Sequence, residues 1–130
     1  MKPADIKKYV LFYDRERKII DKKLAQALKG RSPFSLYDPA SYILESSGKR
    51  LRPLLVLLSA KAVGGNIKNF YNAALSVEML HNFTLVHDDI MDNADLRRGK
   101  LTIHKKYNLN TAILTGDILA AVAYEFLLKD

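Results

Sequence analysis

The sequence predicts an all-α fold, and three observations support that prediction. Apolar residues recur at steps of three and four along most of the chain, which places them on one face of an α-helix. No stretch of useful length alternates between apolar and polar residues, as a half-buried strand would. Helix-breaking residues separate the periodic segments, namely Gly30, Pro33 and Gly64–Gly65. We therefore expect about five helices and no internal repeat.

The helical pattern is clearest in the first two thirds of the chain. A first helix is expected over residues 4–28, followed by a short polar segment at 37–46. A second helix is expected over 54–63, because Pro53 suits the first turn of a helix. A third, long helix covers residues 69–92.

The last third of the chain combines a polar segment with an apolar one. Residues 93–110 are expected to form a loop, and a last helix runs from Thr111 to the end of the chain. That helix has few polar positions on any face, so neighbouring elements must bury it. We expect either a partner subunit or further residues of a longer chain to cover it.

The composition excludes several classes of protein. A chain of 130 residues makes one domain or part of a larger one, and 48% hydrophobic residues are too many for a disordered chain. The absence of cysteine excludes disulfides and thiolate metal sites and fits a reducing compartment. No signal peptide is visible. The most apolar run, residues 113–128, is shorter than the roughly 20 residues that span a bilayer. We therefore expect no stable membrane insertion.

The basic residues gather near the N-terminus. The net charge is +7, and residues 1–30 hold nine basic residues against four acidic ones. One interpretation is a basic helical module that binds nucleic acid or an anionic membrane. We favour the other, a solvated face of an amphipathic helix, because no nucleic-acid-binding motif accompanies the charges. No nucleic-acid partner is expected.

An acidic cluster ends the long helix. At about 100° per residue, Asp88 and Asp92 point the same way one turn apart, while Asp89 lies to the side. Two such carboxylates suit Mg²⁺, which takes one or two protein carboxylates together with phosphate oxygens. The alternative is an acidic helix end that simply faces solvent.

Two basic segments and a histidine accompany the aspartates. Residues 48–53 place three cations just before a helix, and residues 96–100 place three more just after the aspartates. Arginine matches phosphate oxygens with two parallel hydrogen bonds, although mutual salt bridges with the aspartates are the alternative. His81 lies two turns before Asp88 on the same face. We assign no role to His87 and His104, and no histidine metal site is expected.

Taken together, these segments resemble one protein family. Gly-Lys-Arg-Leu-Arg-Pro at 48–53, His81, Leu-Val-His-Asp-Asp-Ile-Met-Asp at 85–92 and Leu-Arg-Arg-Gly at 96–99 are similar in order and spacing to the trans-type polyprenyl (isoprenyl) diphosphate synthases. Gly116-Asp117 also matches, and the resemblance extends from about Ser35 to the end. It implies a helical bundle of the isoprenoid synthase type and a cytoplasmic homodimer that joins isopentenyl diphosphate to an allylic diphosphate.

The resemblance also implies roles for seven residues. Asp88 and Asp92 would hold Mg²⁺ on the allylic diphosphate, and Arg97 would contact that same diphosphate, so these three form the implied catalytic group. Isopentenyl diphosphate would be bound by four others, namely Lys49, Arg52, His81 and Arg98. The implied reaction is metal-assisted departure of diphosphate, attack of the isopentenyl double bond on the allylic cation, and loss of a proton.

Product length is expected to depend on the residues one turn before the aspartates. Thr84 is small and lies on the face of Asp88, whereas Phe83 is about 140° away and reaches the growing prenyl chain only from its side. As a wall of the prenyl tunnel, Phe83 implies a product of farnesyl to geranylgeranyl size. The alternative is that Phe83 is an ordinary core residue.

The sequence departs from the family pattern at two positions and lacks one of the family's motifs. Leu101 and Ser47 stand where the family usually has proline and glycine, and no second aspartate-rich motif occurs in these residues. Residues 1–130 are therefore expected to be the N-terminal part of a single synthase domain whose second half is absent, and to be inactive alone. A non-catalytic or regulatory subunit of a heteromeric synthase is the alternative.

Overall fold

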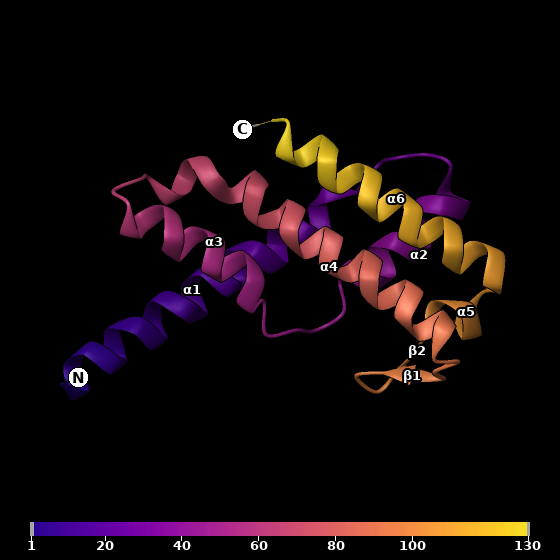
Figure 1. The fold of residues 1–130 in the computed structure, drawn as a ribbon, viewed down its shortest axis with the longest axis horizontal. Helices are drawn as coiled ribbons and strands as arrows, with labels where there is room; N and C mark the ends of the chain where they lie inside the picture. The colour runs from indigo at the N-terminus through magenta and orange to yellow at the C-terminus, as the bar shows by residue number, and fades with distance from the viewer. Residues whose placement is uncertain (1, 130) are drawn as a thin grey trace.

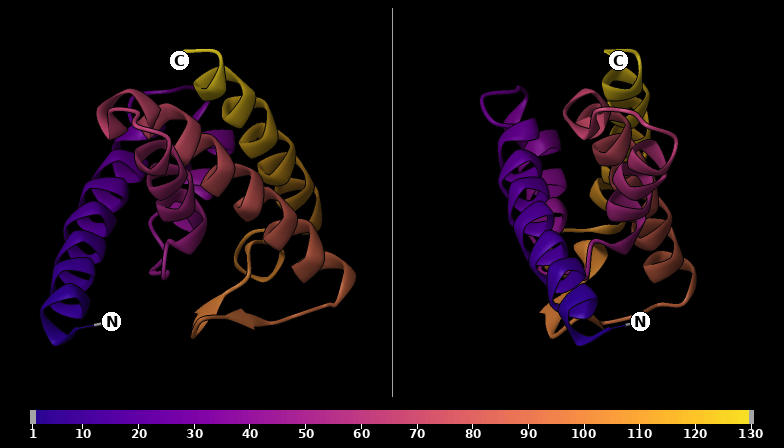
Figure 2. Two further views of the ribbon diagram at one scale, coloured as in Figure 1. Left: turned by 60° about the vertical axis from the view of Figure 1, so that its left-hand side comes forward. Right: turned by 90° about the vertical axis from the view of Figure 1, so that its left-hand side faces the viewer.

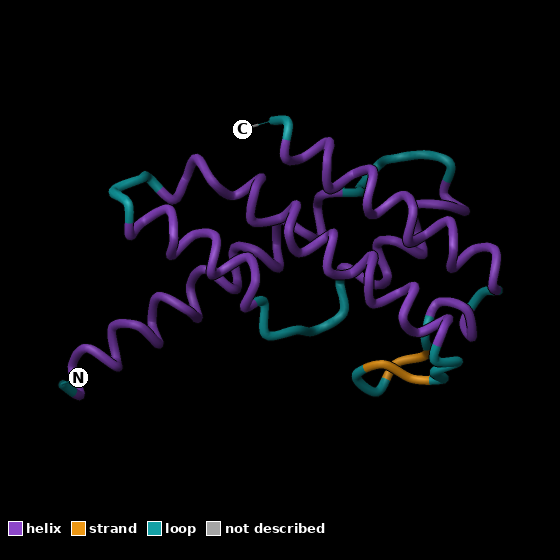
Figure 3. The backbone as a smooth tube through the Cα atoms, viewed as in Figure 1, coloured by secondary structure: helices purple, strands orange, loops and turns teal. Residues whose placement is uncertain are grey.

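The computed structural model describes residues 2–129 and confirms the all-α class (Figures 1 and 3). Six α-helices, one 3₁₀ helix and one short hairpin follow in chain order over these residues: α1 (Pro3–Ala27), α2 (Phe34–Leu44), α3 (Leu51–Ala62), η1 (Ile67–Phe70), α4 (Tyr71–Met91), β1 (Leu96–Arg97), β2 (Lys100–Leu101), α5 (Ile103–Lys106) and α6 (Leu109–Leu127).

Helices α4 and α6 form the centre of the bundle and lie side by side in both rotated views (Figure 2). They pack tightly at Gly116, where an added Cβ would lie 2.2 Å from Nε2 of His87. The buried core draws side chains from all six α-helices of the described residues, among them Ile20, Leu24, Ile43, Leu44, Leu54, Leu57, Leu75, Met79, Val86, Ile103, Leu119, Val122 and Phe126. Burial of this apolar surface is the main force that holds the helices together.

Helix α1 confirms the amphipathic pattern only over its second half. Ile20 and Leu24 are fully buried, and between them Lys22 is exposed while Asp21 and Lys23 are partly exposed. The first half extends away from the other helices (Figure 1), and its apolar residues Ile6 and Val10 are about half exposed.

The segment expected to be a short polar stretch, residues 37–46, is mostly helix α2. Ala40, Ile43 and Leu44 are buried at helical spacing, so packing against the core compensates for Pro39 inside the helix. The polar composition of the segment concealed this short apolar face.

The loop expected over residues 93–110 contains two short elements. A two-residue turn joins β1 to β2, and both of its residues, Arg98 and Gly99, have positive φ, as a type I′ turn requires. Helix α5 follows. Strands of two residues are too short to produce an alternating pattern, which is why the sequence predicts only a loop.

Two helix starts differ from the prediction by a few residues. Helix α3 begins at Leu51, so Pro53 lies third in its first turn, where its missing N–H would have no partner inside the helix in any case. Helix α6 begins at Leu109, because the side chain of Asn108 accepts a hydrogen bond from the backbone N–H of Thr111 at 2.8 Å.

One face of α6 packs on α4 and α2, and the other carries exposed apolar side chains. These are Leu109, Ile113, Leu114, Tyr124 and Leu127. The apolar surface foreseen for this helix is therefore only partly covered within residues 2–129. No helix in that range combines the length and the apolar character needed to cross a bilayer.

Candidate active site

A cationic pocket brings together four residues that are far apart in the sequence. It has a volume of about 550 Å³, and its lining includes Lys49, Arg52, His81 and Arg98. These are the four residues for which the resemblance implies isopentenyl diphosphate binding. The folded chain therefore concentrates positive charge at one place, although the residues come from three separate segments.

These four residues reach the pocket from three parts of the fold. Lys49 precedes α3 and Arg52 belongs to its first turn, while His81 lies in the middle of α4. Arg98 occupies the hairpin turn, and its Nη1 donates to the carbonyl oxygen of Ser47 at 2.8 Å. Gly48 leaves room for this contact, because a Cβ there would lie 2.7 Å from the same Nη1 and the arginine side chain would have to shift.

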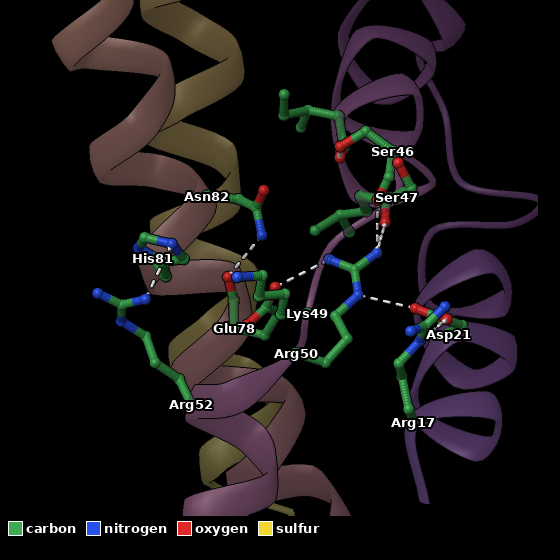
Figure 4. A network of polar contacts seen from close by, with 12 residues as sticks. Arg17, Asp21, Ser46, Ser47, Lys49, Arg50, Arg52, Glu78, His81 and Asn82 are labelled. Atoms are coloured by element: carbon green, nitrogen blue, oxygen red, sulfur yellow. Dashed lines mark hydrogen bonds and ion pairs between the residues drawn. The ribbon is translucent and has the colours of Figure 1, made fainter. Parts of the chain in front are cut away.

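Arg52 and His81 are in direct contact (Figure 4). Nη1 of Arg52 lies 3.2 Å from Nε2 of His81, and since a guanidinium can only donate, the imidazole nitrogen accepts. Burial and the charge of Arg52 lower the pKa of His81, so the ring is neutral near pH 7 and carries its proton on Nδ1.

The three aspartates of the acidic cluster have different environments. Asp88 and Asp92 are exposed, and the backbone N–H of Asp92 still donates to the carbonyl of Asp88 at 2.8 Å, so the helical register continues through both. Asp89 is buried and accepts hydrogen bonds from Arg97 Nε at 3.0 and 2.9 Å and from Arg97 Nη2 at 2.8 Å. This ion pair raises the pKa of Arg97.

The carboxylates at this helix end fit a hard cation only in part. Over the described residues, no group of three or more histidine, cysteine, aspartate or glutamate side chains could hold a metal ion. Asp88 and Asp92 supply two carboxylates one helical turn apart, which is the protein's usual share of a Mg²⁺ site completed by phosphate oxygens. The donor chemistry therefore fits Mg²⁺ bound together with a diphosphate.

Phe83 and Thr84 lie between the cationic pocket and the aspartates. Thr84 is exposed, and its hydroxyl donates to the carbonyl of His81 at 2.7 Å. Phe83 is half-buried against the core, and its ring meets that of His87 edge to face with 4.8 Å between centroids. Both the wall and the core interpretation of Phe83 agree with this position.

Sequence reasoning missed three residues that organise this region. Asp89 pairs with Arg97, and Arg50 forms a buried ion pair with Glu78, which also lines the cationic pocket. Helical spacing shows which residues share a face, but it does not show which distant side chain will meet them. The available signal in the sequence was that the carboxylates Glu78 and Asp89 belong to a chain rich in basic residues, with which they could form ion pairs.

Comparison with known proteins identifies the family. The sequence model of the polyprenyl synthetase family matches residues 34–130. The chain belongs to this family. It is 47% identical over 110 residues to geranylgeranyl pyrophosphate synthase of Geoglobus acetivorans, which covers 85% of the chain and 34% of that relative. It is 38% identical over 128 residues to geranylfarnesyl diphosphate synthase of Natronomonas pharaonis, covering 86% of the chain and 38% of that protein.

Solved structures place the fold among the isoprenoid synthases. The geranylgeranyl pyrophosphate synthetase from Geoglobus acetivorans superimposes with a TM-score of 0.87 at 44% identity, covering 91% of this chain and 39% of that one. A heptaprenyl diphosphate synthase from Staphylococcus aureus gives 0.80 at 40% identity, with coverage of 89% and 37%. This member of the polyprenyl synthetase family thus spans about a third to two fifths of the length of these relatives.

Proposed function

We propose that this chain forms the N-terminal part of a single polyprenyl diphosphate synthase domain. The domain would condense isopentenyl diphosphate with an allylic diphosphate to give a prenyl diphosphate of farnesyl to geranylgeranyl size. A homodimeric, cytoplasmic protein belongs to the same proposal and follows from the resemblance alone.

One observation carries the proposal. His81, which lines the cationic pocket, lies on α4, and the carboxylates Asp88 and Asp92 lie at the end of the same helix, so that His81 precedes Asp88 by seven residues, or roughly 10 Å of helix axis. Two diphosphates bound at these two places would lie a short distance apart. That separation suits a reaction that joins two diphosphate substrates.

Different residues of the chain would bind the two substrates. Lys49, Arg52 and Arg98 bind the isopentenyl diphosphate, and the Nδ1 proton of His81 is available to a phosphate oxygen. Asp88 and Asp92 orient the allylic diphosphate at the end of α4. Holding both substrates in one orientation removes much of the entropic barrier to their reaction.

Mg²⁺ bound by Asp88 and Asp92 would stabilise the negative charge that develops on the departing diphosphate. Arg97, held by Asp89, presents a guanidinium beside the same carboxylates and would add to that stabilisation. The allylic cation must also be kept from water, which requires apolar walls.

A prenyl-transfer assay on the complete protein that carries this sequence tests the proposal. We expect labelled isopentenyl diphosphate and farnesyl diphosphate to give one longer prenyl diphosphate in the presence of Mg²⁺ and none with a chelator. Absence of turnover by the purified complete protein, combined with activation of a second synthase, would instead support the regulatory-subunit alternative.

A further inference from the structure

The most extensively bonded side chain in this region is an arginine for which the resemblance implies no role. Arg50 is 4% exposed, although arginine is almost never buried unless it is paired. Its Nε donates to Asp21 at 2.7 Å, and its Nη1 donates to Glu78 at 2.8 Å. Its Nη2 donates to the carbonyl oxygens of Leu44 at 2.9 Å and Ser46 at 2.7 Å (Figure 4).

These bonds join four parts of the fold at one guanidinium. Asp21 belongs to α1, Glu78 to α4 and Leu44 to the end of α2, while Arg50 itself is the residue before α3. The neighbouring carbonyl of Lys49 is held from another side, because the Tyr13 hydroxyl donates to it at 2.9 Å. The path of the segment between α2 and α3 is thus fixed by contacts made at Lys49 and Arg50.

The backbone at Arg50 is in the left-handed region, with φ of 51°. This conformation is uncommon for residues with a Cβ and persists where the surroundings impose it. Because the chain turns here, the Arg50 guanidinium is buried at the wall of the cationic pocket, between Lys49 and Arg52, which line the same pocket.

Glu78 poses an electrostatic problem for that pocket. It lines the same pocket as Lys49, Arg52 and Arg98, and its side chain is 5% exposed, so water screens its charge poorly. Its charge also reaches His81, one turn further along α4. An unpaired carboxylate at this position would repel the diphosphate that the cations attract.

We propose that Arg50 is a positioning residue that makes this pocket an anion site, by neutralising Glu78 and by fixing the backbone that presents Lys49 and Arg52. The inference rests on the proposed function, since it takes the diphosphate of isopentenyl diphosphate as the ligand. Arg50 acts on that ligand through Glu78 and the backbone, because four of its five N–H donors are already bonded to protein oxygens.

Opposite effects of the two partners of one ion pair provide the test. In the complete protein, Arg50→Met leaves Glu78 buried and unpaired, so we expect the dissociation constant of isopentenyl diphosphate to rise by about tenfold or more. Glu78→Gln removes the repelling carboxylate and keeps Arg50, so we expect unchanged or tighter binding. Adding Glu78→Gln to Arg50→Met should recover part of the lost affinity. Calorimetric titration measures all three.

A merely structural role would give a different pattern. Loss of either partner would then lower the melting temperature, and the affinity of the folded fraction would stay unchanged or fall in both single variants. The conservative Arg50→Lys keeps the charge but not the four hydrogen bonds, and we expect an intermediate loss of affinity. Steady-state kinetics should show a raised KM for isopentenyl diphosphate with little change for the allylic substrate.

Arg31→Met is the matched control. Arg31, which precedes α2, also pairs with a helical glutamate, through two hydrogen bonds of 2.8 and 2.7 Å to Glu125 of α6, and it does not line the pocket. It should leave the affinity unchanged. If the wild-type protein does not bind isopentenyl diphosphate, the proposed function is wrong. If the wild-type protein binds it and Arg50→Met and Glu78→Gln have equal affinities, only the role of Arg50 is wrong.

Discussion

Single residues in this protein owe their chemistry to partners that lie far away in the sequence. His81 lies on an ordinary helix, yet a contact with Arg52, twenty-nine positions earlier, decides which of its nitrogens carries the proton. Asp89 differs from its exposed neighbours Asp88 and Asp92 because it is paired with Arg97, which lies in β1 eight positions later. Both contacts lead to measurable expectations.

The first expectation concerns the titration of His81. Burial, followed by the charge of Arg52, lowers its pKa below the ordinary value of 6.5, so the unfolded chain takes up this proton first as the pH falls. The stability contributed by the neutral ring is therefore complete above about pH 6.5 and is lost as the pH falls below it. NMR titration should give a pKa below 6.5 that rises in Arg52→Met and not in Arg31→Met. A wild-type value at or above 6.5 would contradict this environment.

The second expectation separates the three aspartates. Asp88→Ala and Asp92→Ala remove exposed carboxylates, so stability should change by no more than about 0.5 kcal/mol while most turnover is lost. Asp89→Ala should do less harm to turnover but should lower stability by about 1.5–3 kcal/mol, because it removes hydrogen bonds to a charged partner. Denaturant unfolding and the prenyl-transfer assay measure the two quantities. Equal and small effects on turnover at all three positions would contradict the metal–diphosphate site.

Residue spacing predicted part of this site and could not predict the rest. The separation of seven positions from His81 to Asp88 places both on one face because helical geometry is regular. The meeting of Arg98 with Ser47, and of Arg50 with Glu78, depends on how helices pack, which no local pattern encodes. Asp89 was expected to lie to the side of the pair, and it does, but its burial was not foreseen.

At the level of whole elements, α4 and α6 pack closely where Gly116 of α6 faces His87 of α4. The ring of His87 occupies the space that a side chain at position 116 would need, and its Nε2 donates to the carbonyl of Ile113 at 3.2 Å. Long helices were predicted well because their periodic pattern is strong, whereas the polar composition of the segment hid α2 and the hairpin strands are too short to give a pattern. The contact at Gly116 was invisible in the pattern.

We expect Gly116→Ala to destabilise the α4–α6 pair by about 1–3 kcal/mol, as overpacking of a core does. His87→Ala should open the space, so the double variant should be more stable than the sum of the two single effects implies. Chemical denaturation of the four proteins measures this coupling. Additive effects would show that the two residues do not share this space.

Truncation of Phe83 distinguishes a wall of the prenyl tunnel from an ordinary core residue. If it forms a wall of the prenyl tunnel, Phe83→Ala in the complete protein should lengthen the products, which chromatography of the prenyl alcohols would resolve. As an ordinary core residue, Phe83 should when truncated lower stability by about 3 kcal/mol or more and leave the products unchanged. An unchanged product distribution would refute the wall.

For the molecule as a whole, the uncovered face of α6 limits what residues 1–130 can do alone. Apolar surface left in water is unfavourable by about 25 cal/mol per Å², so a few exposed large side chains amount to several kcal/mol, comparable to the stability of a domain. Those side chains include Leu114 and Tyr124, which are 55% and 61% exposed. The need for cover was predictable from the sequence, but which face would lack it was not.

We therefore expect the isolated 130-residue chain to self-associate and to show no prenyl transfer. Analytical ultracentrifugation, together with the assay on material of the corresponding mass, measures both. Weak Mg²⁺-dependent diphosphate binding should survive, because the cationic pocket and the two exposed aspartates are present. Robust product from a monomer of that mass would contradict the need for a second aspartate-rich half.

Arg98 lies where the backbone and the ligand favour different residues. Its φ of 52° in a two-residue hairpin turn suits asparagine or glycine and costs an arginine roughly 1 kcal/mol, whereas the proposed isopentenyl diphosphate site uses the guanidinium of this residue. Selection for thermal stability alone would favour Arg98→Asn, and that same change would weaken isopentenyl diphosphate binding. An engineer seeking a more heat-resistant synthase should therefore leave this turn alone, although it is among the first places that a stability criterion would choose.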